Sequence, residues 1–146
     1  MVNNKEEWER LDPSVQSITV NGCDDYLSEL LDLSRFGELV ELKIGSSCFN
    51  YVSVMSISRL PKLKSVEIGE KSFQNESTDS QLMVKNCPAL ISLKIGNQSF
   101  KGFKRFNLSE VNGLKSIAVG DECFKECDLV LKELKNVESV CIGSGS

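Results

Sequence analysis

Cysteine is the residue type in this chain with the widest chemistry, because a thiol can bind a metal, form a disulfide or act as a nucleophile. The sequence contains six cysteines and no histidine. Cys123 and Cys127, in CFKEC, have the spacing of half a zinc site, but no second pair at zinc spacing accompanies them. We therefore expect no bound metal and no cofactor.

Groups of side chains that support catalysis are also missing from the sequence. Without histidine the chain has no Ser–His or Cys–His dyad, and it has no glycine-rich phosphate-binding loop. The carboxylates are spread along the chain rather than gathered in one motif. We therefore expect that this protein is not an enzyme.

One stretch of sequence recurs along the chain and indicates how the other residues are positioned. It reads LVELKIGSSCF from Leu39, LKSVEIGEKSF from Leu63, LISLKIGNQSF from Leu90 and LKSIAVGDECF from Leu114, and a fifth start, VESVCIG, follows at Val137. The starts are 24, 27, 24 and 23 residues apart. Self-similarity at such a period is typical of a solenoid, in which each repeat buries its apolar face against its neighbours. The longer second interval predicts a polar loop in QNESTDSQ.

Apolar residues within each copy predict a short strand that ends in a bend. Leu42 and Ile44 are two residues apart, so they share one face while the residues beside them point to the other. A glycine follows each predicted strand and suggests a bend or a close approach of the next coil. These glycines are Gly45, Gly69, Gly96, Gly120 and Gly143.

A second set of apolar residues predicts short extended segments on the return side of each coil. The paired positions are Leu31/Leu33, Met55/Ile57, Leu82/Val84, Phe106/Leu108 and Leu129/Leu131, and a third inward column holds Phe36, Leu60, Cys87, Val111 and Leu134. The predicted fold class is a mostly β repeat solenoid with a small N-terminal capping helix. It has a parallel sheet of about six short strands on one face and short extended segments and turns on the other.

The repeated stretch resembles the leucine-rich repeat family, whose pattern is L-x-x-L-x-L-x-x-N-x-L, over roughly residues 15–146. The glycine after the strand and the Ser-Phe or Cys-Phe ending, as in VGDECFKEC, are most similar to the short, β-rich BspA-like subclass. The asparagine of the family pattern is replaced by Ser47, Lys71, Gln98 and Glu122, so the family's amide ladder is absent. The resemblance implies that the outward face of the parallel sheet binds a protein.

Both ends of the array depart from the repeat. Residues 1–14 are predicted to form an N-terminal cap, with a short helix that begins after Asn4 and places Trp8 over the edge of the core. Tyr26 is predicted to stand where later copies have phenylalanine. The alternative is a helix over DDYLSELLDLSRF, capped by Asp24.

Residues 15–146 are predicted to form a solenoid of about five and a half repeats. IGSGS from Ile142 matches the start of the earlier turns but lacks the phenylalanine that follows in them. We expect a fragment of a longer array, or an open edge that meets another copy or partner. The alternative for GSGS is a flexible linker.

Charge and composition bear on partners and location. A net charge of −4 and a pI of about 5.0 argue against nucleic-acid binding, and KGFKRF is interpreted as a solvated face. No signal peptide and no apolar run of membrane-spanning length is visible, so we expect no membrane contact. Cysteines in core columns favour a reducing, cytoplasmic compartment, whereas N-x-S sequons at Asn75, Asn97 and Asn107 leave a secreted or cell-surface protein open.

The candidate partner-binding surface is the outward side of the predicted parallel sheet. Its residues are Ser17, Thr19, Glu41, Lys43, Ser65, Glu67, Ser92, Lys94, Ser116 and Ala118. The predicted function is a protein-protein interaction module that presents this face to a protein partner. The short Ser and Ala side chains offer few anchors for such a partner. The alternative is a structural or adhesive solenoid that self-associates end to end through its C-terminal edge.

Overall fold

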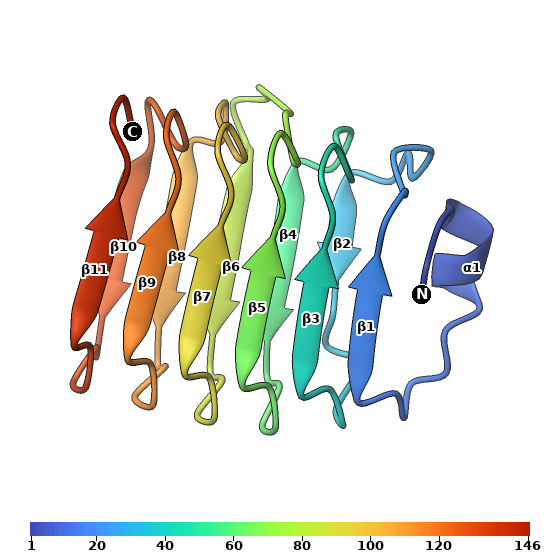
Figure 1. Ribbon diagram of the computed structural model, residues 1–146, viewed down its shortest axis with the longest axis horizontal. Coiled ribbons are helices and arrows are strands. Elements are labelled where there is room, and N and C mark those ends of the chain that lie inside the picture. The colour runs from blue at the N-terminus through green and yellow to red at the C-terminus, as the bar shows by residue number, and fades with distance from the viewer.

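The chain folds into a flattened β-solenoid in which successive coils contribute strands to two facing parallel sheets (Figure 1). The computed structural model describes residues 1–146. The first sheet has six strands: β1 (Ser17–Val20), β3 (Glu41–Ile44), β5 (Ser65–Ile68), β7 (Ser92–Ile95), β9 (Ser116–Val119) and β11 (Ser139–Ile142). The second has five: β2 (Leu30–Asp32), β4 (Val54–Ser58), β6 (Gln81–Lys85), β8 (Arg105–Ser109) and β10 (Asp128–Lys132). The predicted fold class is confirmed.

The core lies between the two sheets and is formed by the inward residues of alternating strand positions. Leu42 and Ile44 of β3 are buried, as are Leu93 and Ile95 of β7, while the residues between them are exposed. From the second sheet Leu82 and Val84 are fully buried against them. The period of two in the repeat therefore predicts the inward residues correctly.

Aromatic rings stack along one edge of the core, one from each successive coil. Ring centroids lie 5.6 Å apart between Phe49 and Phe73, 4.6 Å between Phe73 and Phe100, and 5.2 Å between Phe100 and Phe124. The first three rings are fully buried, whereas Phe124 in the last coil is only partly buried. The aromatic column thus follows the solenoid axis and becomes exposed at its C-terminal end.

Glycines after the strands allow adjacent coils to approach closely at the bend. A Cβ atom on Gly96 would lie 2.7 Å from the backbone carbon of Gly69, and one on Gly69 would lie 2.6 Å from that of Gly45. Real Cβ atoms do not make such contacts, so a side chain here would push the coils apart. Close approach of the next coil is therefore the reason for these glycines.

A ladder of hydroxyl and thiol groups connects the coils immediately after this bend. Ser99 accepts a hydrogen bond from the Ser72 backbone N–H at 3.1 Å, and its hydroxyl donates to the Gly69 carbonyl at 2.6 Å. Ser72 makes the same two bonds to Cys48 and Gly45, and the Cys123 thiol donates to the Gly96 carbonyl at 3.2 Å. Ser72 and Ser99 are fully buried. Ser and Cys side chains therefore make the hydrogen bonds between coils that asparagine makes in the family which the repeat resembles.

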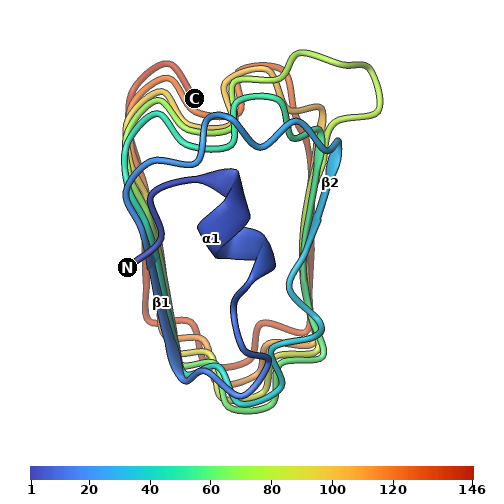
Figure 2. The ribbon, with the colours of Figure 1, turned by 90° about the vertical axis from the view of Figure 1, so that its right-hand side faces the viewer.

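The N-terminal end of the solenoid is covered by helix α1 (Lys5–Glu9), which Figure 2 shows lying across the interior of the coil. The Asn4 side chain caps it by accepting from the Glu7 backbone N–H at 2.9 Å. Trp8 is 4% exposed and packs edge-on against Phe36 and Phe49, with centroids 5.8 and 5.4 Å apart. The predicted capping helix and the role of Trp8 are confirmed.

The segment after β1 forms the first return strand rather than a helix. Tyr26 lies with its ring centroid 5.5 Å from that of Phe49, so it does stand in for the missing phenylalanine. The alternative of a helix over DDYLSELLDLSRF is wrong, because residues 30–32 pair in parallel with β4. Leu31 and Leu33 are buried, as their spacing of two predicts for an extended segment.

The extra residues of the second interval form a loop that projects from the stack, in the yellow-green segment of Figure 2. Residues 76–79 are exposed and carry no helix or strand. Ser80 closes the loop, because its buried hydroxyl donates to the Ser77 carbonyl at 2.6 Å. The predicted polar loop is confirmed.

Candidate functional site

The structure brings all the predicted outer-face residues onto one side of the first sheet, where the strands lie side by side (Figure 1). Strand register places them in two columns that run along the solenoid axis. One column contains Ser17, Glu41, Ser65, Ser92 and Ser116, and the other contains Thr19, Lys43, Glu67, Lys94 and Ala118. Register also adds Ser139 and Cys141 of β11 to the C-terminal ends of these columns.

Charged side chains gather in the middle of this face. Glu67 and Lys94 lie opposite each other on β5 and β7, with carboxylate and ammonium groups 4.0 Å apart and side chains 52% and 67% exposed. On β3 the Lys43 ammonium is 3.3 Å from the Glu41 carboxylate. Exposed pairs of this kind contribute little to stability, about 0–1 kcal/mol each. Their charges therefore remain available to a binding partner.

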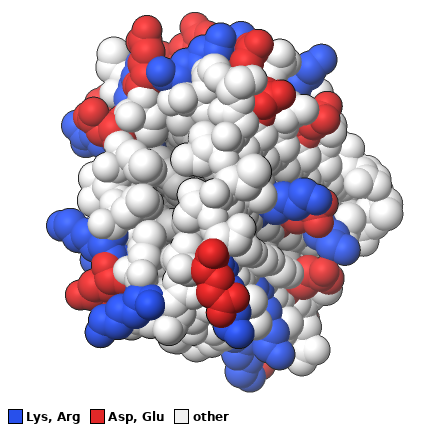
Figure 3. Space-filling model, turned by 60° about the vertical axis from the view of Figure 1, so that its left-hand side comes forward, with Lys and Arg blue, Asp and Glu red and all other residues white.

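The C-terminal edge of the solenoid is a second candidate site, because no coil covers its apolar residues. Val140 and Ile142 of β11 are 56% and 54% exposed, and Leu129 and Leu131 of β10 are 52% and 46% exposed. Figure 3, turned toward this end, shows uncharged surface bordered by Lys, Arg, Asp and Glu side chains. Exposed edge strands with apolar side chains are sites of pairing with another chain.

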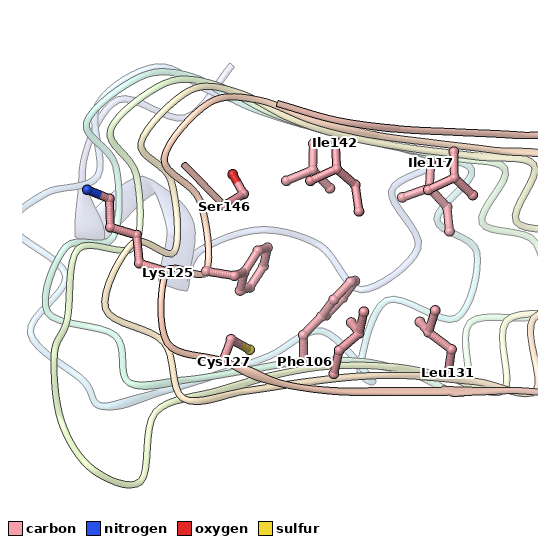
Figure 4. Close-up of a pocket in the computed structure, with 11 residues that line it drawn as sticks. Phe106, Ile117, Lys125, Cys127, Leu131, Ile142 and Ser146 are labelled. Atoms are coloured by element: carbon pink, nitrogen blue, oxygen red, sulfur yellow. The ribbon is translucent and has the colours of Figure 1, made fainter. Parts of the chain in front are cut away.

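A hollow of about 290 Å³ opens at this edge between the two sheets (Figure 4). The residues that line it are mainly apolar: Phe106, Ile117, Val119, Phe124, Cys127, Leu129, Leu131, Val140 and Ile142, together with Lys125 and Ser146. Leu129, Leu131 and Leu134 were expected among the buried inward columns. Leu129 and Leu131 line the hollow and Leu134 packs on the core, but the first two are exposed and the third is only partly buried, because β10 is the edge strand of its sheet.

The cysteines divide into core residues and one surface residue. Cys23, Cys48, Cys87 and Cys123 are fully buried, and Cys141 is exposed. Burial raises the pKa of the Cys23 thiol to about 12 and that of the Cys127 thiol to about 11. Since the thiolate is the nucleophile, these groups are poor candidates for chemistry. All six are free thiols, and no three His, Cys, Asp or Glu side chains cluster closely enough to hold a metal ion.

No protein-family model, curated protein or solved structure matches this chain. None of its helical structure is long and apolar enough to cross a bilayer. The outer face of the first sheet and the C-terminal edge are therefore the two candidate surfaces for function.

The buried ladder behind these surfaces was not anticipated from the sequence. The Ser and Cys ladder was missed because the family pattern directs attention to the asparagine position, whereas the bonding side chain comes one residue later. A signal for the ladder was available in the alignment of the copies, in which every full copy has Ser or Cys at this position: Cys48, Ser72, Ser99 and Cys123.

Proposed function

We propose that this protein is a protein-protein interaction module that presents the outer face of its six-stranded sheet to a protein partner. The observation that carries the proposal is the continuous pair of outward-facing columns on that face, with the exposed side chains of Glu67 and Lys94 at its centre. A solenoid supplies such an extended surface on a backbone held by its neighbouring coils. Complementary charge then governs encounter rate and selectivity more than affinity.

We further infer that the repeats are leucine-rich repeats, closest to the short, β-rich BspA-like subclass. Support comes from the position of each strand, which spans the third to sixth residues of the motif, as β7 does in LISLKIG. Further support is the inter-coil ladder, in which Ser72 and Ser99 make bonds of the kind that the family makes with asparagine.

The outer-face proposal is tested by reversing both central charges in one variant, Glu67→Lys with Lys94→Glu. This variant keeps the net charge and the ion pair but inverts the field that a partner meets. We expect it to lose capture of the partner in affinity purification with mass-spectrometric readout, while its melting temperature stays that of the parent.

A matched control is available in the ion pair between Glu38 and Lys62, which also joins successive coils but lies at a turn before β3 and β5. Reversal of both of these charges should leave capture unchanged. If the outer-face variant and the control capture the same proteins as the parent, the outer face is not the binding surface.

A second candidate function is end-to-end self-association through the C-terminal edge, as a structural or adhesive solenoid. The observation that favours it is the exposure of apolar side chains on both β10 and β11, including Val140 and Ile142. Light scattering across a range of concentrations tests this function without knowledge of a partner. We expect an assembly that the charged variant Val140→Asp converts to a monomer.

A further inference from the structure

We propose that a second copy of this chain covers the C-terminal edge, tail to tail about a two-fold axis, with β10 and β11 each pairing antiparallel to their own counterpart. The proposal rests on the second candidate function, edge association, and adds the partner, its orientation and its register. It makes the assembly a closed dimer rather than a growing rod.

The sequence of β10 is self-complementary in this arrangement. β10 reads DLVLK, from Asp128 to Lys132. In an antiparallel pair centred on Val130, Asp128 faces Lys132 of the second copy at both ends of the strand. Leu129 likewise faces Leu131 of the second copy on the inner side. Opposite charges and matched apolar residues directly across an antiparallel pair are stabilising.

The other return strands lack this pattern, so parallel stacking does not require it. β4 reads VMSIS, β6 reads QLMVK and β8 reads RFNLS, and none has opposite charges at its two ends. These strands stack in parallel with a neighbour on each side. Of the two edge strands of this sheet, β2 reads LLD, and only β10 carries an acidic residue at one end and a basic residue at the other.

The backbone of β10 presents the hydrogen-bonding groups that this register needs. The Asp128 N–H donates to the Lys104 carbonyl at 2.8 Å, toward the interior of the sheet. Because backbone groups alternate along a strand, Asp128, Val130 and Lys132 bond toward β8, whereas Leu129 and Leu131 direct theirs to the open edge. The facing leucines would therefore form the hydrogen-bonded pairs, and Val130 would lie in the narrow non-hydrogen-bonded pair between them.

The same two-fold axis aligns β11 with its counterpart. The N–H groups of Ser139 and Gly143 donate inward, to Lys115 and Val119, so Val140 and Ile142 direct their backbone groups to the open edge. Antiparallel pairing centred on Cys141 would then place Val140 against Ile142 of the second copy.

The two strand centres lie at the same level of the coil, as one axis requires. Figure 4 shows Leu131 across the hollow from Ile117, and Ile142 across from Phe106. Ile117 is in register with Val140, and Phe106 with Leu129. The midpoints of these pairs are Cys141 on β11 and Val130 on β10, so a single axis passes through both.

The N-terminal end is covered at β1 and over the core, which disfavours the alternative, head-to-tail stacking. Val2 forms a bridge with Val20, donating to the Thr19 carbonyl at 2.7 Å and accepting from the Asn21 N–H at 2.8 Å. The free side of β1 is thus bridged at Val20, and Trp8 covers the core beside it. At the N-terminal end only β2 keeps an unpaired side, whereas both β10 and β11 are open at the C-terminal end, so an isologous two-fold contact between C-terminal ends is the arrangement that closes.

Cys141 provides a direct test of the axis, because it is exposed and would face its own copy. In a non-hydrogen-bonded antiparallel pair the Cα atoms are about 4.5 Å apart, within the range that a disulfide bridges. We expect a particle of twice 16.2 kDa in reducing buffer by light scattering. Mild oxidation should then give a Cys141–Cys141 cross-link by peptide mapping. Cys141→Ser should abolish the cross-link and keep the dimer, whereas Cys127→Ser should keep both.

The charge pattern of β10 allows a second test by rescue. Asp128→Lys or Lys132→Asp alone sets like charges opposite each other twice in the dimer, and should raise the dimer dissociation constant by at least about tenfold. The double variant Asp128→Lys with Lys132→Asp restores opposite charges and should return the constant to within about threefold of the parent.

The possible results test the strand register, the two-fold closure and edge association separately. A dimer that neither cross-links at Cys141 nor shows rescue would overturn this register while edge association stands. An assembly that keeps growing with concentration would overturn the two-fold closure in favour of a rod. A monomer at all concentrations would overturn both the dimer and edge association, and would leave the edge to a further coil or another protein. None of these results bears on the outer-face proposal, which is tested independently by partner capture.

Discussion

Non-glycine residues with left-handed backbone conformation recur in successive coils from Ser47 onward. Lys71 and Phe73 both have φ of 56°, and Gln98 and Phe100 have φ of 60° and 53°. Side chains with a Cβ atom disfavour this region by about 1–2 kcal/mol relative to the right-handed one. The tight turn after the glycine is therefore strained. Packing of the phenylalanine ring and the hydrogen bonds of the buried ladder offset the cost of this strain.

This strain predicts that Lys71→Gly stabilises the protein, although glycine usually destabilises. Lys71 is exposed, and its backbone N–H bond to the Asn97 carbonyl does not depend on the side chain. The free energy gained by removing the left-handed strain exceeds the stabilisation of the unfolded chain by the extra backbone entropy of glycine. We expect the free energy of unfolding to rise by about 0.5–1 kcal/mol in urea titrations.

The matched control is Lys64→Gly. Lys64 is also exposed and donates its backbone N–H to another coil, but its φ is not positive. That variant should lose about 0.5–1 kcal/mol. A loss of similar size in Lys71→Gly would show that the left-handed turn is not strained.

Strands and turns in this fold depend on bonds between coils as much as on their own sequences. The ladder residue Ser99 satisfies the Ser72 N–H and the Gly69 carbonyl, both in the preceding coil. Water does not reach this fully buried position. Removal of the hydroxyl therefore leaves two backbone groups of a neighbouring coil without partners.

We expect Ser99→Ala to lower the free energy of unfolding by about 1–3 kcal/mol. Ser99→Cys should cost less, because Cys123 occupies the equivalent position and still donates to a carbonyl. Ser92→Ala, on the outer face of the same coil, should change stability by less than about 0.5 kcal/mol. Equal effects of the two alanine substitutions in urea titrations would contradict a structural role for the ladder.

The strands were predictable at this scale because their signal is local. Leu42 and Ile44 show the period of two, and the glycine after them repeats in each copy, so six strands and their inward faces follow from the alignment of the copies. The ladder was not predictable, because it depends on which coil Ser99 reaches. The helix alternative around Asp24 failed because parallel pairing of β2 with β4 outweighs the local capping signal.

The whole molecule is a linear stack, so its stability is distributed from one neighbour to the next. The N-terminal coil is covered by Trp8, whereas β10 and β11 carry exposed apolar residues on one free side. Central strands are paired on both sides. We infer that protection from unfolding is highest in the centre and lowest at the C-terminal edge.

Hydrogen exchange at a concentration that keeps the protein monomeric measures this gradient. We expect amides of β10 and β11 to exchange first and those of β5 and β7 last. Trp8→Ala removes the cover of the other end, so β1 and β2 should then exchange nearly as fast as β11, with β7 unchanged. Uniform acceleration along the whole chain would indicate a single cooperative unit instead.

The loop at residues 76–79 is a place where the length and sequence of this chain can vary during evolution. Its ends are held by the stack itself, through Gln74, whose N–H bonds to Asn50, and through Ser80, whose hydroxyl closes the turn. Residues 76–79 between these two points are exposed and carry no strand, so residues gained or lost there leave the pairing of β4, β6 and β8 unaltered. New sequence can therefore be acquired at this corner without disturbing the scaffold, and the solenoid can host variation at a place apart from both of its candidate surfaces.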